Sequence, residues 1–120
     1  MGPRARLYAD DGLSVLWLSR GEQELALSAE GVWLRARSRE RELTWTEIEQ
    51  VQMSPMRLFG PALAWVDLFT AGAAERVGLF PEPLAGSWVA AAAAAAATAG
   101  CSPLPLQGAT GFAIPSPGGA

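Results

Sequence analysis

This chain of 120 residues carries a net charge of -3 and has a pI near 4.9, which excludes the dominant positive field that nucleic-acid binding needs. Its length allows one hydrophobic core and is too short for two ordinary ones. It contains no histidine and a single cysteine, Cys101, so the usual neutral-pH base, imidazole-activated nucleophiles, the commonest metal ligand and an intramolecular disulfide are excluded.

The first half of the chain predicts short strands joined by tight turns. Apolar and polar residues alternate in several segments, and glycines at 12, 21 and 31 lie in the turns between them. The chain therefore begins with hairpins, and the expected strands fall at residues 7–8, 13–18, 25–27 and 32–37.

An arginine stripe follows from Trp33, because every second residue after it is basic: Arg35, Arg37, Arg39 and Arg41. Residues spaced by two share one face of a strand. Such a stripe could bind a phosphate headgroup or an acidic partner. The other interpretation is a solvated face with a charged turn, partly neutralised by neighbouring glutamates. We expect the second, because the turn should break the alignment of the last two arginines.

The next segment predicts a one-turn helix at residues 47–50. Thr46, followed three residues later by Glu49, fits the capping-box pattern. Trp45 ends the strand before this turn and Ile48 follows it. We expect both apolar side chains to be buried.

A short strand is expected at residues 51–53, and it should end at the Ser54-Pro55 pair because proline cannot donate to a strand ladder. The loop that follows carries Met56, Leu58 and Phe59. These apolar side chains either form a lip that binds a partner or fold back to cap the core.

The second half predicts a hairpin, with strands at 64–69 and 76–80, and then a helix. The helix should run from Trp88 to about Ala99, with Ser87 before it as N-cap and Gly100 closing it. Its alanine run has the highest intrinsic helix propensity. The helix should dock against an open end of a sheet, anchored by its first two residues.

The chain divides into a domain at residues 1–100 and a tail at residues 101–120 that is rich in proline, glycine and serine. In the tail only a few side chains can pack, among them Leu104, Leu106 and Phe112. Such a segment buries too little apolar surface by itself to offset the conformational entropy that it would lose on ordering. We expect it to be disordered or to be an arm that docks on a partner.

These features resemble the bacterial pleckstrin-homology-like (PH-like) domains. The resemblance rests on the glycine turn into an apolar strand at 30–34, the charged run after it, and a strand ending in Trp45 followed by an acidic-Ile-x-x-Val turn at 47–51. Over about residues 7–99 it implies an α+β fold: a split barrel or strongly bent antiparallel sheet of about seven strands, closed by a C-terminal helix. The chain lacks lysine and a basic cluster at 10–12, which departs from the lipid-binding branch.

We therefore expect a cytoplasmic, non-enzymatic protein-interaction module without cofactor or metal, which associates with itself or is a small subunit of a larger assembly. Its longest apolar run is too short to span a bilayer. Its contact surface would be an exposed strand edge, the loop at residues 56–59, the alanine helix or the tail. The alternative is a peripheral domain that binds an anionic ligand or a membrane surface through Trp33, Arg35 and Arg37. A third hypothesis is a small-molecule carrier with a tryptophan-lined pocket.

Overall fold

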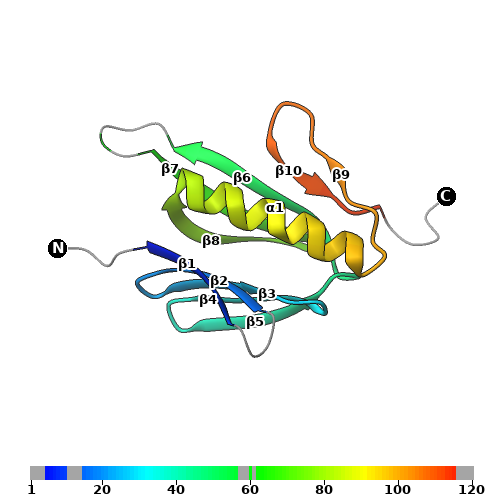
Figure 1. Cartoon of the computed structure of the whole chain (residues 1–120), viewed down its shortest axis with the longest axis horizontal. Helices are drawn as coiled ribbons and strands as arrows, with labels where there is room; N and C mark the ends of the chain where they lie inside the picture. The colour runs from blue at the N-terminus through cyan, green and yellow to red at the C-terminus, as the bar shows by residue number, and fades with distance from the viewer. Residues whose placement is uncertain (1–4, 11–14, 57–59, 61, 116–120) are drawn as a thin grey trace.

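The computed structural model describes residues 5–10, 15–56, 60 and 62–115. It has an α+β fold with two five-stranded antiparallel sheets and one helix (Figure 1). The first sheet contains, in chain and spatial order, β1 (Ala5–Asp10), β2 (Val15–Arg20), β3 (Gln23–Leu27), β4 (Gly31–Ala36) and β5 (Arg39–Thr44). The second contains, in spatial order, β8 (Ala73–Pro81), β7 (Leu63–Thr70), β6 (Ile48–Met56), β10 (Thr110–Ala113) and β9 (Leu104–Pro105). The helix, α1 (Glu82–Thr98), lies between β8 and β9 in the chain.

The α+β class is confirmed, but the expected strand number was too low. In the described residues eight strands precede α1 and two follow it, so the helix is not the last element. The first sheet is the predicted series of hairpins. Its alternation places Leu18, Leu25 and Leu34 in the core. A Cβ on Gly31 would lie 2.0 Å from the carbonyl oxygen of Leu43, so β4 can approach β5 only with glycine at this position.

The connection between the two sheets is a turn and not the predicted one-turn helix. Residues 45–47 form the turn, and β6 begins at Ile48. The capping contact uses Thr44 and Glu47 in place of Thr46 and Glu49: the Glu47 carboxylate accepts hydrogen bonds from the Thr44 N–H at 3.1 Å and from its hydroxyl at 2.9 Å. Trp45 and Ile48 are buried, as expected.

Strand β6 is longer than predicted, because it continues through Pro55 to Met56. Its partner β10 pairs with it only as far as Met53, so Pro55 lies beyond the last paired position on that side. On its other side Pro55 stands opposite Ala64 of β7. A missing N–H is therefore tolerated there. The hairpin of β7 and β8 is confirmed, with Gly72 in its turn.

Helix α1 begins at Glu82 rather than at Trp88, and no side chain in the described part of the chain caps its N-terminus. Pro83 lies in its first turn, where the N–H groups have no helical partner, so proline does not break the helix. Its C-terminus is as predicted: Gly100 has a φ of 87° and donates to Ala97, and the next N–H donates to Ala96. The buried face of the helix consists of Ala85, Trp88, Val89, Ala92 and Ala96.

The tail is not disordered over its described part. After the helix the chain turns back, and β10 pairs with β6 while β9 pairs with β10. Phe112 is 3% exposed and Ile114 is also buried. A Cβ on Gly111 would lie 2.2 Å from the Val51 carbonyl oxygen, so glycine allows the close pairing with β6. Residues 104–113 thus extend the second sheet instead of forming a free arm.

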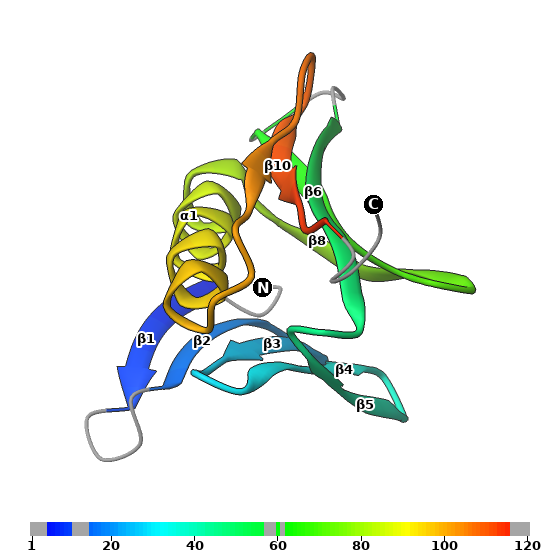
Figure 2. The ribbon, with the colours of Figure 1, turned by 90° about the vertical axis from the view of Figure 1, so that its right-hand side faces the viewer.

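The two sheets face each other at an angle, and α1 covers the open side between them (Figure 2). On the opposite side, β8 lies against β2, β3 and β4. The core fills the space that the sheets and the helix enclose, with Phe80 and Trp88 as its largest fully buried side chains. Among the described residues, no helix is long and apolar enough to cross a membrane.

Candidate functional site

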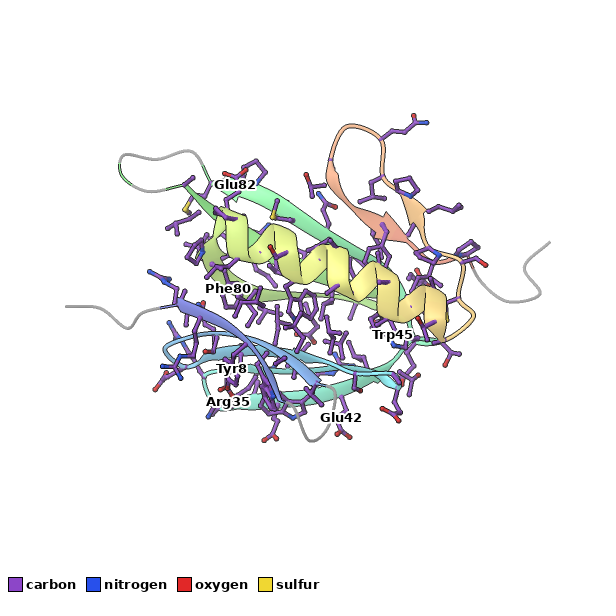
Figure 3. The ribbon with its side chains drawn as sticks, in the orientation of Figure 1. Tyr8, Arg35, Glu42, Trp45, Phe80 and Glu82 are labelled. Carbon is purple, nitrogen blue, oxygen red and sulfur yellow. The ribbon has the colours of Figure 1, made fainter. Side chains whose placement is uncertain are left out.

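One row of side chains crosses the whole first sheet on the face turned away from the core, which we call the outer face. The register places Tyr8, Trp17, Ala26, Trp33 and Glu42 opposite one another on the five successive strands. Most of their chain neighbours on the other face belong to the core, among them Leu18, Leu25 and Leu34, so this row must point outward. Figure 3 shows Tyr8 and Glu42 on the side of the sheet that faces away from α1.

Three aromatic rings in this row contact one another, and we call Tyr8, Trp17 and Trp33 the aromatic row. Tyr8 stacks on Trp17 with ring centroids 6.2 Å apart, and Trp17 meets Trp33 edge to face at 5.5 Å. Ala26 lies between the two indoles in register and is 3% exposed, so its small side chain lets them meet above it. The rings themselves remain accessible, since Tyr8 is 40% exposed and both indoles are half-buried.

Beside the indoles lies a hollow of about 570 Å³, which we call the aromatic hollow. Its only charged lining residues among those described are Glu30 and Glu42. The Glu30 carboxylate accepts a hydrogen bond from the Ser28 hydroxyl at 3.0 Å. Among the described residues, the Glu42 side chain makes no hydrogen bond or ion pair. The remaining lining residues are Val15, Trp17, Ala26, Leu27, Ser28, Gly31, Val32, Trp33, Leu43 and Thr44.

The four arginines do not form one continuous stripe, as we expected from the turn between them. Arg35 shares the outer face with Trp33, but its guanidinium pairs with Glu24 at 2.9 Å. Trp33 donates its indole N–H to Glu40 at 3.0 Å. Arg37 lies in the turn after β4 with a φ of 59°, so it has left the strand face. On the outer face the Arg35 guanidinium is therefore already paired, and the indole N–H of Trp33 is already bonded to a carboxylate.

The last two arginines of the stripe turn to the opposite face, as the sequence led us to expect. In the register Arg41 stands opposite Leu34, a core residue. Arg39 and Arg41 both form ion pairs with Glu75 of β8. These two arginines therefore join the first sheet to the second.

The other predicted contact residues are scattered. Met56 ends β6 and is half-buried, while Leu58 and Phe59 lie outside the described residues. In the tail, Leu104 is 56% exposed and Phe112 is buried against the core. Leu106 is half-buried, and its N–H bonds the carbonyl of Gly111. Of the described loop and tail residues in this set, only Leu104 is exposed.

The second sheet carries its own tryptophan and charge cluster on its outer face. Asp67 of β7 stands opposite Arg76 of β8 and accepts hydrogen bonds from its Nε at 2.8 Å and from its Nη2 at 3.2 Å. The Arg76 guanidinium lies 4.6 Å from the centroid of the Trp65 ring. Hydrogen bonding to Asp67 raises the pKa of Arg76 above its ordinary value. This tryptophan is therefore already covered by a cation of the same chain.

A larger hollow, of about 730 Å³, lies at the C-terminal end of α1. Glu47, Glu49 and Cys101 are among its lining residues. The pKa of Glu47 is lowered, chiefly by the hydrogen bond from the Thr44 backbone and then by that from the Thr44 hydroxyl. Both glutamates are exposed to solvent, and Trp45 is the only aromatic residue among the described residues that line this hollow. The described residues contain no cluster of three or more possible metal ligands.

Sequence reasoning found Trp33 but missed Tyr8, Trp17 and Glu42 as its neighbours. Alternation does place each of them on one face of its own strand. What brings them together is the strand register, which the hydrophobic pattern and the geometry of the turns set together. The short turns around Gly21 and Gly31 were the available signal.

Comparison of this chain with models of protein families, with curated proteins and with solved structures found no match.

Proposed function

We propose that this chain is a non-enzymatic protein-interaction module, which binds a partner protein through the outer face of the first sheet. The observation that carries the proposal is the aromatic row, whose rings contact one another and stay partly exposed. Tyrosine and tryptophan are enriched at the centres of protein interfaces, because they bury a large area at a small cost in side-chain entropy. The rigid sheet beneath them holds the rings in place before a partner arrives.

The charge of this face favours a different protein over a second copy of the chain. Two copies placed face to face would bring mostly acidic groups together, which is unfavourable. The edge of the first sheet also disfavours self-pairing, because β5 alternates arginine and glutamate at residues 39–42. On the outer face and at the rim of the aromatic hollow the described acidic residues are Glu24, Glu30, Glu40 and Glu42, and the basic ones are Arg6 and Arg35.

The alternative function, binding of an anionic ligand or a membrane surface through Trp33, Arg35 and Arg37, has less support. Arg35 is already paired with Glu24, and the Trp33 indole donates to a carboxylate. An incoming phosphate would have to displace Glu24 and approach Glu40 and Glu42. Flotation with acidic vesicles separates the two functions, and salt-sensitive co-flotation of the chain would favour the alternative.

We also propose that the architecture is PH-like. Support comes from the order of a strand meander, a second group of strands and a helix, and from the way α1 covers the open side between two inclined sheets (Figure 2). The hairpin of β9 and β10, which follows the helix and adds to β6, is an extension that the resemblance does not imply.

Photo-cross-linking tests the proposed function. A photoreactive phenylalanine analogue replaces Tyr8, which is exposed in the aromatic row, and a matched variant carries it at Leu104, which is exposed on the second sheet. We expect illumination in the host cell to give protein adducts from position 8 and only background from position 104. Adducts from position 104 alone, or from neither position, would contradict the proposal. An adduct of twice the chain mass would point to self-association.

A further inference from the structure

The second sheet shows how this chain binds a guanidinium on an aromatic surface. Three groups take part: the ring of Trp65, the carboxylate of Asp67 and the guanidinium of Arg76, which lies over the ring while two of its N–H groups bond the carboxylate. The carboxylate and the arginine stand opposite each other on neighbouring strands. Arginine suits such a site because its planar group stacks on rings and is weakly hydrated.

The first sheet also places an indole beside a carboxylate, but across two strands, whereas Trp65 and Asp67 lie two residues apart on β7. Trp33 stands directly opposite Glu42 on the neighbouring strand, and Trp17 adds a second indole. Among the described residues no guanidinium lies over either indole, since the cation–π contacts there are those of Arg6 with Tyr8 and Arg76 with Trp65.

The charge of the aromatic hollow favours a cation as its ligand. Its described lining contains two glutamates and no basic residue, and Glu42 is unpaired within the described residues. The nearest arginine on this face, Arg35, is committed to Glu24. With about 570 Å³ the hollow is larger than an arginine side chain. A carboxylate beside an indole face attracts a cation more strongly than either group alone.

We infer that the aromatic hollow receives a basic side chain of the partner protein, arginine in preference to lysine, which stacks on the indoles of Trp17 and Trp33 and bonds the Glu42 carboxylate. This inference rests on the proposed function and adds the chemistry of the partner. It predicts a partner segment with a basic residue at the centre of its contact surface.

Peptide titration tests the inference without knowledge of the partner. The probes are blocked tri-arginine, tri-lysine and tri-citrulline peptides, of which the last keeps the shape of arginine but lacks its charge. The readout is the indole N–H spectrum of the nitrogen-15-labelled chain. The five indoles report on separate regions: Trp17 and Trp33 on the outer face of the first sheet, Trp65 on the second sheet, and Trp45 and Trp88 in the core.

We expect tri-arginine to shift the signals of Trp17 and Trp33 and to bind about fivefold more tightly than tri-citrulline at about 0.15 M salt. Glu42→Gln should weaken tri-arginine binding about fivefold. The matched variant Glu22→Gln, which removes the same charge from an exposed turn away from the hollow, should leave binding unchanged.

Several results would overturn the inference. The inference fails if tri-citrulline binds as tightly as tri-arginine, or if Glu42→Gln and Glu22→Gln change tri-arginine binding equally. It also fails if tri-arginine shifts the Trp65 signal most, or if tri-arginine does not bind. Tri-lysine binding as tightly as tri-arginine would overturn the preference for arginine. If position 8 still cross-links a protein while the peptides fail these tests, the proposed function stands and only the basic partner residue is wrong. If position 8 gives no adduct, the proposed function itself fails.

Discussion

The side-chain amide of Gln23 bonds both polar groups of the Leu79 backbone. Its Nε2 donates to the Leu79 carbonyl at 3.0 Å, and its Oε1 accepts from the Leu79 N–H at 3.3 Å. Gln23 begins β3 in the first sheet and Leu79 lies in β8 of the second, so the amide takes the place of a neighbouring strand at the edge of β8. Gly78 leaves room for it, because a Cβ there would lie 1.7 Å from the Gln23 Oε1.

Replacing Gln23 with alanine should therefore loosen the contact between the sheets. The Leu79 N–H and C=O lose this partner inside a partly buried contact, so the free energy of unfolding should fall by about 1–3 kcal/mol. Gly78→Ala should act in the same direction, because its methyl group displaces the amide. Urea unfolding measures both, with Glu22→Ala as the exposed control expected within about 0.5 kcal/mol of the parent. A Gln23→Ala chain as stable as the control would show that this contact does not hold the sheets together.

Trp45 ties the turn between the sheets to the core. It is 3% exposed, and its indole N–H donates to the Ser28 carbonyl at 3.2 Å. Trp45→Ala should lower the free energy of unfolding by about 3–5 kcal/mol, the range for a large aromatic side chain in a core. Trp45→Phe should cost less, because it leaves a smaller cavity. An unchanged melting temperature for Trp45→Ala would contradict the assigned role of this residue.

The tail should contribute to stability, which reverses the expectation from its composition. Phe112 of β10 packs in the core, so Phe112→Ala should cost about 3–5 kcal/mol. Leu104→Ala in the adjacent strand is the matched control, and its exposed side chain predicts a change within about 0.5 kcal/mol. Thermal unfolding at low protein concentration decides whether the tail stabilises the fold or is a free arm. Equal stability of the Phe112→Ala and Leu104→Ala variants would indicate that the tail is a free arm.

Stability should depend on the ionisation of Glu47. Hydrogen bonds from Thr44 lower its pKa in the folded chain below the ordinary value of 4.5. The stabilisation is therefore fully present above pH 4.5 and is lost as the pH falls through the lower pKa of the folded state. Unfolding curves from neutral pH downward should show a smaller acid loss for Glu47→Gln than for the parent. Identical pH profiles would mean that the carboxylate is not held by this turn.

The elements that sequence reasoning found depend on local signals, and those it missed depend on distant contacts. Gly31 and the alternation around it are enough to predict β4, and Gly100 is enough to end the helix. The capping contact was misassigned because Thr44 and Glu47 have the same spacing as Thr46 and Glu49, and only the position of the turn selects between them.

The tail and the candidate site both required knowledge of strand pairing. β10 is short and lies among prolines and glycines, and it is ordered only because β6 offers an unpaired edge. In the same way Trp33 could be placed on an outer face from alternation, but its contact with Trp17 exists only through the register across Ala26. Neither the composition of the chain nor the period of its apolar residues shows which side chains become neighbours across strands.

We propose that the outer face of the first sheet binds a partner through the aromatic hollow. Charge reversal at two exposed glutamates tests this proposal, with the photoreactive residue kept at position 8. Glu42→Arg places a cation of the chain itself beside Trp33, while Glu22→Arg makes the same change of charge in the turn between β2 and β3. Equal melting temperatures would establish that both chains fold. We predict that Glu22→Arg gives the adduct yield of the parent and that Glu42→Arg lowers it about tenfold or more. Equal yields from the two variants would contradict the claim.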